Sequence, residues 1–240
     1  MSTYLDASKA KARLQLLEVF QICDSTFPIG TFNHSFGLEN YLFERRIQKV
    51  PEFDIWFKNY FSSQFLYGEG LLVCLCYQAL DQQREADLLR YDRIMTMSTL
   101  AKETRAGTKL IAKQMLRLLE GIHGQSSVVA DYQTAIREGK AFGNPAIAFA
   151  LFAHSRQIDV MDAFLLYGYS IGSTMVQNAV RAIPLGQMEG QKILNRLNHQ
   201  LIELWEIVAN LDEFHLGANA PGIELSQMKH ETQESRLFMS

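Results

Sequence analysis

The sequence contains no motif whose residue types and spacing would support catalysis. A phosphate-binding loop of the form GxxxxGK(S/T) is absent, because the segment GTKLIAKQ, which starts at Gly107, lacks the second glycine. The chain also has no GxSxG nucleophile turn, no HExxH zinc motif and no pair of CxxC motifs. Without a nucleophile beside a base, we expect a protein that is not an enzyme and that has no tightly bound cofactor.

The metal-ligating residue types are scattered along the chain. No two of the six histidines are four residues apart, which is the spacing that places two ligands on one helix face. His215, beside Asp212 and Glu213, is the one candidate ligand, and no metal site is predicted from it. Cys74 and Cys76 lie on different faces of a helix, so we expect them to be buried apolar residues. Three cysteines cannot close a disulfide framework, which is typical of a reducing compartment.

Two other segments have features of binding sites. In the loop from Phe27 to Glu39, FPIGTFNHSFGLE, three phenylalanines occur among turn-forming residues. We expect Phe27 and Phe36 to fill the core, and Phe32 to be an exposed interface anchor. The tail from residue 228 ends in Leu-Phe-Met, which is apolar and should pack either on its own domain or on a partner. Arg236 would supply a multidentate contact beside that apolar end.

A third candidate surface is a stripe of basic residues. Arg105, Lys109, Lys113 and Arg117 repeat at intervals of four and therefore share one helix face. Such a stripe is either a solvated face or a docking site for an acidic partner surface.

Helical signals run along the whole chain and predict an all-α fold. Ser35 is expected to cap a helix from Leu38, Pro51 to open the next one, and Asn144-Pro145 to begin a third. Glycines at 68 and 70 predict a break, and Gly168 and Gly172 predict close helix packing. From His215 the chain is expected to be loop-like. We predict one domain over residues 1–240, a bundle of about nine to ten helices with a tail ordered by a partner at about 222–240.

The composition narrows the class of protein. The 240 residues are 48% hydrophobic and 20% charged, which is globular and excludes a disordered chain. A net charge of −3 gives no general attraction to nucleic acid or to an anionic membrane. Neither a signal peptide nor an apolar run long enough for a membrane span is visible, so we expect a soluble cytoplasmic protein.

Three blocks of the sequence resemble UreF-type urease accessory proteins. The loop FPIGTFNHSFGLE matches the family's proline-x-glycine turn followed by an aromatic residue, a histidine or tyrosine, and Ser-x-Gly-Leu-Glu. The second block is QNAVRAIPLGQMEGQKIL at 177–194. The third is the tail at 228–240, with its Met-x-His-Glu and Ser-Arg-Leu-Phe elements. The segment ETRAGTKLIAKQMLRL at 103–118 is similar more loosely, so the likeness covers nearly the whole chain.

The resemblance implies an all-α, non-catalytic protein that forms a homodimer. Such proteins bridge a UreD/UreH-type accessory protein and the nickel-carrying GTPase UreG, and they couple GTP hydrolysis to nickel delivery into apo-urease. GTP is then bound by the partner GTPase and nickel is handled by the complex. Some relatives have a histidine–cysteine pair before the tail that can take nickel. Here His215 is present but Gly217 stands at the cysteine position, so no such site is expected.

The resemblance also implies which residues meet partners. Phe32 matches the family's loop aromatic and Arg236 its tail arginine, and both support assembly in the family. The tail as a whole becomes ordered with the UreD/UreH-type partner. With the basic stripe and the loop motif, the expected partner-binding residues are Phe32, His34, Ser35, Glu39, Arg105, Lys109, Met228, His230, Glu231, Arg236, Leu237 and Phe238.

Two alternative functions stay open at this point. A metal-dependent helical hydrolase or oxygenase would bring histidine and glutamate side chains together inside the fold and would purify with a bound metal. A GTPase-binding regulator unrelated to urease would leave urease activity unchanged when it is deleted.

Overall fold

The computed structural model describes residues 7–124 and 126–239, and every regular element among them is a helix. The α-helices are α1 (Ala7–Cys23), α2 (Leu38–Phe43), α3 (Val50–Tyr60), α4 (Leu71–Asp81), α5 (Ala86–Ser98), α6 (Lys102–His123), α7 (Ser127–Arg137), α8 (Pro145–Ser155), α9 (Val160–Ala182), α10 (Gln187–Val208) and α11 (Pro221–His230). A π-helical segment covers Phe61–Gly70, and short 3-10 helices cover Thr31–Asn33 and Glu213–His215. The all-α prediction is confirmed. Residues 1–6, 125 and 240 of the expected domain lie outside this description.

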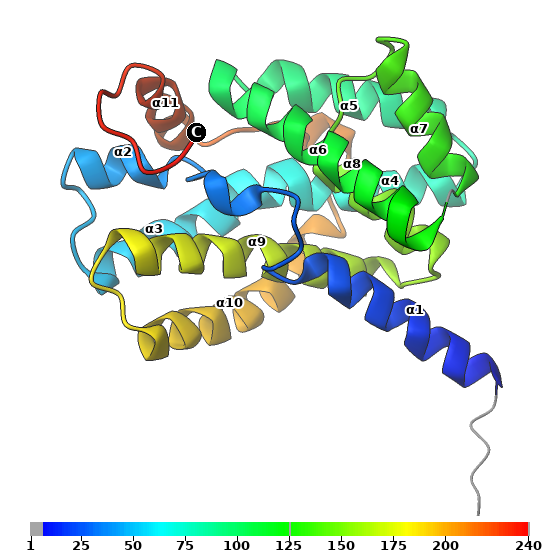
Figure 1. Cartoon of the computed structure of the whole chain (residues 1–240), viewed down its shortest axis with the longest axis horizontal. Helices are drawn as coiled ribbons and strands as arrows, with labels where there is room; N and C mark the ends of the chain where they lie inside the picture. Colours follow the sequence, from blue (N-terminus) through cyan, green and yellow to red (C-terminus); the bar gives the residue numbers. More distant parts are fainter. Residues whose placement is uncertain (1–6, 125, 240) are drawn as a thin grey trace, which may run out of the picture.

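Helix α8 forms the centre of the core (Figure 1). Its first nine residues, 145–153, are all buried, and α4, α6, α7 and α9 pack around it. Asn144 caps its start as predicted, because the side-chain oxygen accepts a hydrogen bond from the Ala146 N–H at 2.9 Å. The first N–H groups of a helix have no acceptor within the helix, and Pro145 in the first turn has no N–H that would need one.

Helices α9 and α10 pack closely along their lengths, and two glycines allow their approach. A Cβ added at Gly172 would stand 2.1 Å from Leu197 Cδ2, and one at Gly168 would stand 2.6 Å from Leu201 Cδ2. The leucines of α10 therefore occupy the space that larger residues on α9 would fill. The prediction that these glycines serve helix packing is confirmed.

The chain from α3 to α4 is one long helical run with a distortion in its middle. Pro51 lies in the first turn of α3, as predicted. The expected break at 68–70 is a kink rather than an interruption, because Gly68 alone leaves helical geometry with φ −103° and ψ −112°. Glycine tolerates this conformation, so the run turns there without ending.

Two local predictions are wrong. Ser35 does not cap α2: the N-cap is Gly37, in the left-handed region at φ 88°, and Ser35 Oγ instead accepts a hydrogen bond from the Gly37 N–H. The region after His215 is not all loop, because α11 begins at Pro221. The buried side of α11 contains Glu224, Ser226, Gln227 and His230, so it has no apolar periodicity to reveal a helix.

Helix α1 projects from the body of the fold (Figure 1). Val19 and Ile22, near its end, are buried, whereas Leu14 and Leu17 are exposed. Glu18 fixes the base of the helix through an ion pair with Arg156 at 2.5 Å. Within the described part of the chain, no helix is both long enough and apolar enough to cross a membrane.

Candidate functional site

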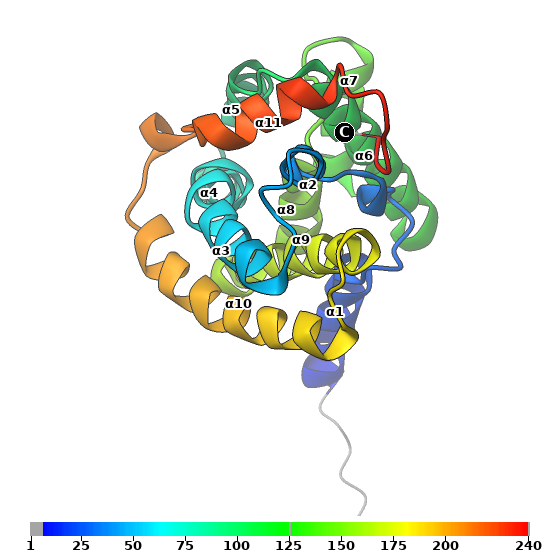
Figure 2. The same cartoon turned by 90° about the vertical axis from the view of Figure 1, so that its left-hand side faces the viewer.

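The C-terminal tail folds back onto the same chain, against α2 and α6 (Figure 2). Helix α11 crosses the short helix α2, and residues 231–239 then return along the 31–39 loop (Figure 2). Two of the blocks singled out in the sequence, the loop and the tail, are therefore one site in space.

Glu39, in the first turn of α2, is the centre of this site. Its carboxylate is buried and accepts hydrogen bonds from the backbone N–H groups of Leu237 and Phe238, the latter at 3.1 Å. His230 Nε2 lies 2.8 Å from the same carboxylate. This buried carboxyl group thus has three hydrogen-bond partners from the end of the chain, two of them backbone N–H donors, which compensates for its removal from water.

His230 itself is held between two carboxylates. Its ring is 1% exposed, with Nε2 at 2.8 Å from Glu39 Oε2 and Nδ1 at 2.8 Å from Glu103 Oε2 on α6. Burial raises the pKa of Glu103, but hydrogen bonds from His230 and Arg236 outweigh this and bring that pKa below its ordinary value.

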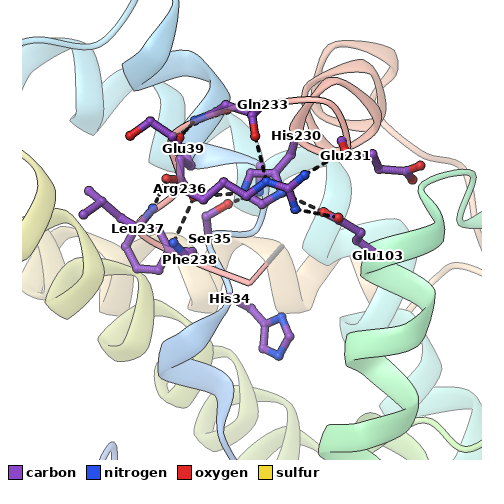
Figure 3. Close-up of polar contacts among 12 residues, drawn as sticks. His34, Ser35, Glu39, Glu103, His230, Glu231, Gln233, Arg236, Leu237 and Phe238 are labelled. Carbon is purple, nitrogen blue, oxygen red and sulfur yellow. Dashed lines mark hydrogen bonds and ion pairs between the residues drawn. The ribbon is translucent and has the colours of Figure 1, made fainter.

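Arg236 completes the cluster (Figure 3). Its Nη1 donates to Glu103 Oε1 at 2.7 Å, Nε donates to the Gln233 carbonyl at 2.9 Å, and Nη2 donates to the Glu231 carbonyl at 2.7 Å. The guanidinium therefore fixes the turn that precedes the last residues. In this structure the expected partner-binding arginine stabilises the tail on its own domain.

The last described residues divide into a buried anchor and an exposed edge. Phe238 is buried, and the guanidinium carbon of Arg181 lies 5.5 Å from its ring centroid. Met239 N–H donates to the Asn33 carbonyl at 2.7 Å, which joins the tail to the loop. Leu237 and Met239 are 66% and 61% exposed. One apolar side chain of the tail, that of Phe238, thus packs on its own domain, whereas those of Leu237 and Met239 are exposed.

The loop places its aromatic residues as predicted. Phe27 is buried, and Phe36 is half-buried against Tyr60, while Phe32 is 50% exposed. We call the exposed apolar residues Phe32, Leu237 and Met239 the loop–tail edge, because the hydrogen bond between residues 33 and 239 brings together the loop and the tail that carry them.

His34 and Ser35 are both buried and lie beneath the loop–tail edge. The His34 carbonyl accepts a hydrogen bond from Asn178 Nδ2 at 2.9 Å. Its ring packs on Gly107, and burial lowers the pKa of this histidine. Figure 3 shows the ring apart from the Glu39–His230 cluster. These two motif residues support the loop from within.

The basic stripe on α6 is only partly open. Lys109, Lys113 and Arg117 are exposed, and Lys109 Nζ lies 4.9 Å above the Phe142 ring. Arg105 differs, because its Nη1 donates to the carbonyls of Thr99 and Leu100 at 2.7 and 2.6 Å. It therefore joins α5 to α6 instead of lying on a free face.

The other tail residues and the metal candidate occupy separate positions. Met228 is exposed, and Glu231 Oε1 accepts a hydrogen bond from the Lys102 N–H at 2.5 Å. His215 Nδ1 pairs with Asp212 Oδ1 at 2.8 Å on the surface. In residues 7–124 and 126–239, no group of three or more His, Cys, Asp or Glu side chains is placed to hold a metal ion. Of the two cysteines predicted to be buried, Cys76 is buried, whereas Cys74 is only half-buried.

Sequence reasoning did not find Glu103 as a site residue. It named Glu39, His230 and Arg236 separately, whereas the structure brings them together through this one carboxylate. An acidic residue in the first turn of a helix is common, because it complements the helix dipole. The sequence therefore carried no signal that Glu103 faces the tail.

Comparison with known proteins identifies the family of this chain. The family model described as UreF matches residues 47–198. The chain is 54% identical over 224 residues to the urease accessory protein UreF of Streptococcus salivarius, which covers 93% of this chain and 94% of that protein. It is 39% identical over 225 residues to UreF of Lachnoclostridium phytofermentans, covering 94% and 98% of the two chains. It is 38% identical over 226 residues to UreF of a Bacillus species, strain TB-90, covering 94% and 99%. The chain belongs to the UreF family of urease accessory proteins.

Proposed function

We propose that this protein is a non-catalytic scaffold in urease maturation. It holds a UreD/UreH-type accessory protein and the GTPase UreG together, so that nickel passes within the complex into apo-urease. GTP and nickel are substrates of the complex and not residents of this chain. Membership of the UreF family supports the role in urease maturation, and the finer assignment of partners rests on the resemblance of the loop and tail motifs.

The observation that carries the proposal is the loop–tail edge. Phe32 and Leu237 come from two motifs that lie about 200 residues apart, and both expose large apolar side chains on one border of the fold. Exposed aromatic and aliphatic side chains at the rim of a rigid, hydrogen-bonded cluster are typical anchors of a protein interface. We assign this edge to the UreD/UreH-type partner.

Co-expression with both partners, followed by affinity capture and sizing chromatography, tests the assignment. We expect the double variant Phe32→Ser/Leu237→Ser to lose the UreD/UreH-type partner while keeping the elution volume of a folded chain. Phe214→Ser is the matched control, because Phe214 is 91% exposed on the 3-10 helix Glu213–His215, away from the loop–tail edge. Capture of the partner at the wild-type level by the double variant would refute the assignment.

A further inference from the structure

We infer that docking of the C-terminal tail takes up one proton, so that His230 acts as a pH-sensitive latch. The inference starts from the two ring nitrogens, which lie 2.8 Å from carboxylate oxygens of Glu39 and Glu103. A neutral imidazole has one N–H donor and one bare nitrogen. A bare nitrogen cannot donate, and it would face a carboxylate lone pair across 2.8 Å.

In the docked tail, both ring nitrogens of His230 can therefore form hydrogen bonds with the carboxyl groups only when one additional proton is present. This proton makes His230 an imidazolium that donates to both carboxylates, or it resides on one carboxyl that donates to the ring. In both cases the closed cluster contains one proton more than a neutral histidine and two carboxylates. With this proton, the net charge of His230, Arg236, Glu39 and Glu103 together is zero. Without it, a buried site has an uncompensated negative charge.

The surrounding charges do not supply an alternative balance. Among the described residues, the charged groups that form ion pairs within this cluster are Glu39 on α2, Glu103 on α6 and Arg236 in the tail, while Arg181 on α9 lies against the Phe238 ring. The other charged side chains along the same interface are engaged elsewhere: Lys229 with Glu44, Arg46 with Glu44, Glu224 with the Leu100 N–H, Glu231 with the Lys102 N–H, and Arg105 with the carbonyls of Thr99 and Leu100.

The latch is linked directly to the position of the tail. Glu39 also accepts the N–H groups of Leu237 and Phe238, so weakening its contact with His230 weakens the tail's attachment. Since docking takes up a proton, the docked tail is favoured at low pH and opens as the pH rises. The docked tail forms the loop–tail edge, so the same proton controls how much of the protein presents that edge. This last consequence rests on the proposed function.

Amide hydrogen exchange of the full-length, isotope-labelled chain tests the latch without any partner. The opening constants of the Leu237 and Phe238 amides are obtained by dividing each rate by its intrinsic rate, between about pH 6 and pH 9. We expect the opening constant to rise with pH, by up to about tenfold per pH unit, over the range in which the docked tail holds this proton and the open tail does not. The Phe142 and Gly143 amides, which donate to buried Asp92, provide an internal reference without a histidine latch.

Two variants make the test specific. His230→Gln has no titrating ring and should lose the pH slope, whereas His215→Gln changes an exposed histidine–aspartate pair and should retain it. If His230→Gln does not fold, Glu103→Gln can replace it in the test. An amide at residue 103 can form a hydrogen bond with a neutral imidazole, so this variant needs no additional proton. That variant should lose the slope and have a better protected tail at the upper pH. A flat profile in the wild type, or a slope that persists in the folded variants, would overturn the latch. Because no urease protein is present, this outcome is independent of the proposed function.

Discussion

The carboxylate of Glu39 accepts a hydrogen bond from the backbone N–H of Phe238, 199 residues further along the chain, at 3.1 Å. This contact joins the first and the last of the sequence blocks that resemble UreF proteins. Because Glu39 lies in the first turn of α2, its charge also complements the positive end of that helix. The tail is thus attached to a helix through Glu39, in addition to its contact with the loop through Met239.

Removal of the Glu39 carboxylate should release the tail. Glu39→Ala leaves two backbone donors and the buried His230 ring without their acceptor, at a cost of about 3 kcal/mol. We expect trypsin to cut after Arg236 at least about tenfold faster than in the wild type. Glu203→Ala, an exposed substitution on α10, should leave the cleavage rate unchanged. Equal rates in the wild type and Glu39→Ala would contradict the role of this carboxylate.

Two glycine substitutions should change stability in opposite directions. Gly172→Ala forces a Cβ to within 2.1 Å of Leu197 Cδ2, so α9 and α10 must separate, and we expect a loss of about 1–3 kcal/mol in the free energy of unfolding. Gly121→Ala meets no atom within 4 Å in helix α6 and should gain about 0.5–1 kcal/mol. Urea denaturation measures both values. A neutral Gly172→Ala would show that the two helices are not in close contact.

Glu69 should make stability depend on pH. It lines two partly open pockets of about 90 and 60 Å³, accepts a hydrogen bond from Tyr167 Oη at 3.1 Å, and has its pKa raised to about 7 by burial. The ordinary value is near 4.5, so folding takes up a proton between these values. The free energy of unfolding attributable to this group therefore falls as the pH rises from about 4.5 to about 7.

Glu69→Gln isolates that contribution. The amide oxygen can still accept from Tyr167, but it has no charge to bury, so the variant should be about 3 kcal/mol more stable than the wild type at pH 8. The two proteins should approach equal stability near pH 4. Denaturation curves across this range give the difference directly, and parallel profiles would contradict the buried titration.

Local signals in the sequence predicted most helices of the core. Asn144-Pro145 and Pro51 are cap and first-turn residues whose effect depends only on their neighbours, and both begin helices where expected. Helix α11 escaped prediction because its buried side is polar, and those polar groups are satisfied by partners far along the chain. Glu224, for example, accepts the Leu100 N–H at 2.9 Å. Such compensation is a property of the tertiary structure.

The sequence predicted most residues of the site but not that they lie together. The exposure of Phe32 followed from its polar neighbours, and the apolar tail was expected to pack either at home or on a partner. The convergence of Glu39, Glu103 and His230 depends on three helices crossing at one point, which residue spacing does not encode. Phe238 packs on its own domain, whereas Leu237 is exposed, and packing of the tail on a partner stays a prediction.

The central claim is that this chain delivers its function through partners that bind the loop–tail edge. The most direct measurement is the nickel content and activity of urease purified from cells that lack this chain and are complemented with its variants. We predict that wild type and Phe214→Ser restore nickel-loaded, active urease, whereas Phe32→Ser/Leu237→Ser leaves the urease poor in nickel although the variant protein is present and folded. Fully active, nickel-loaded urease in cells without the chain, or with the double variant, would contradict the account.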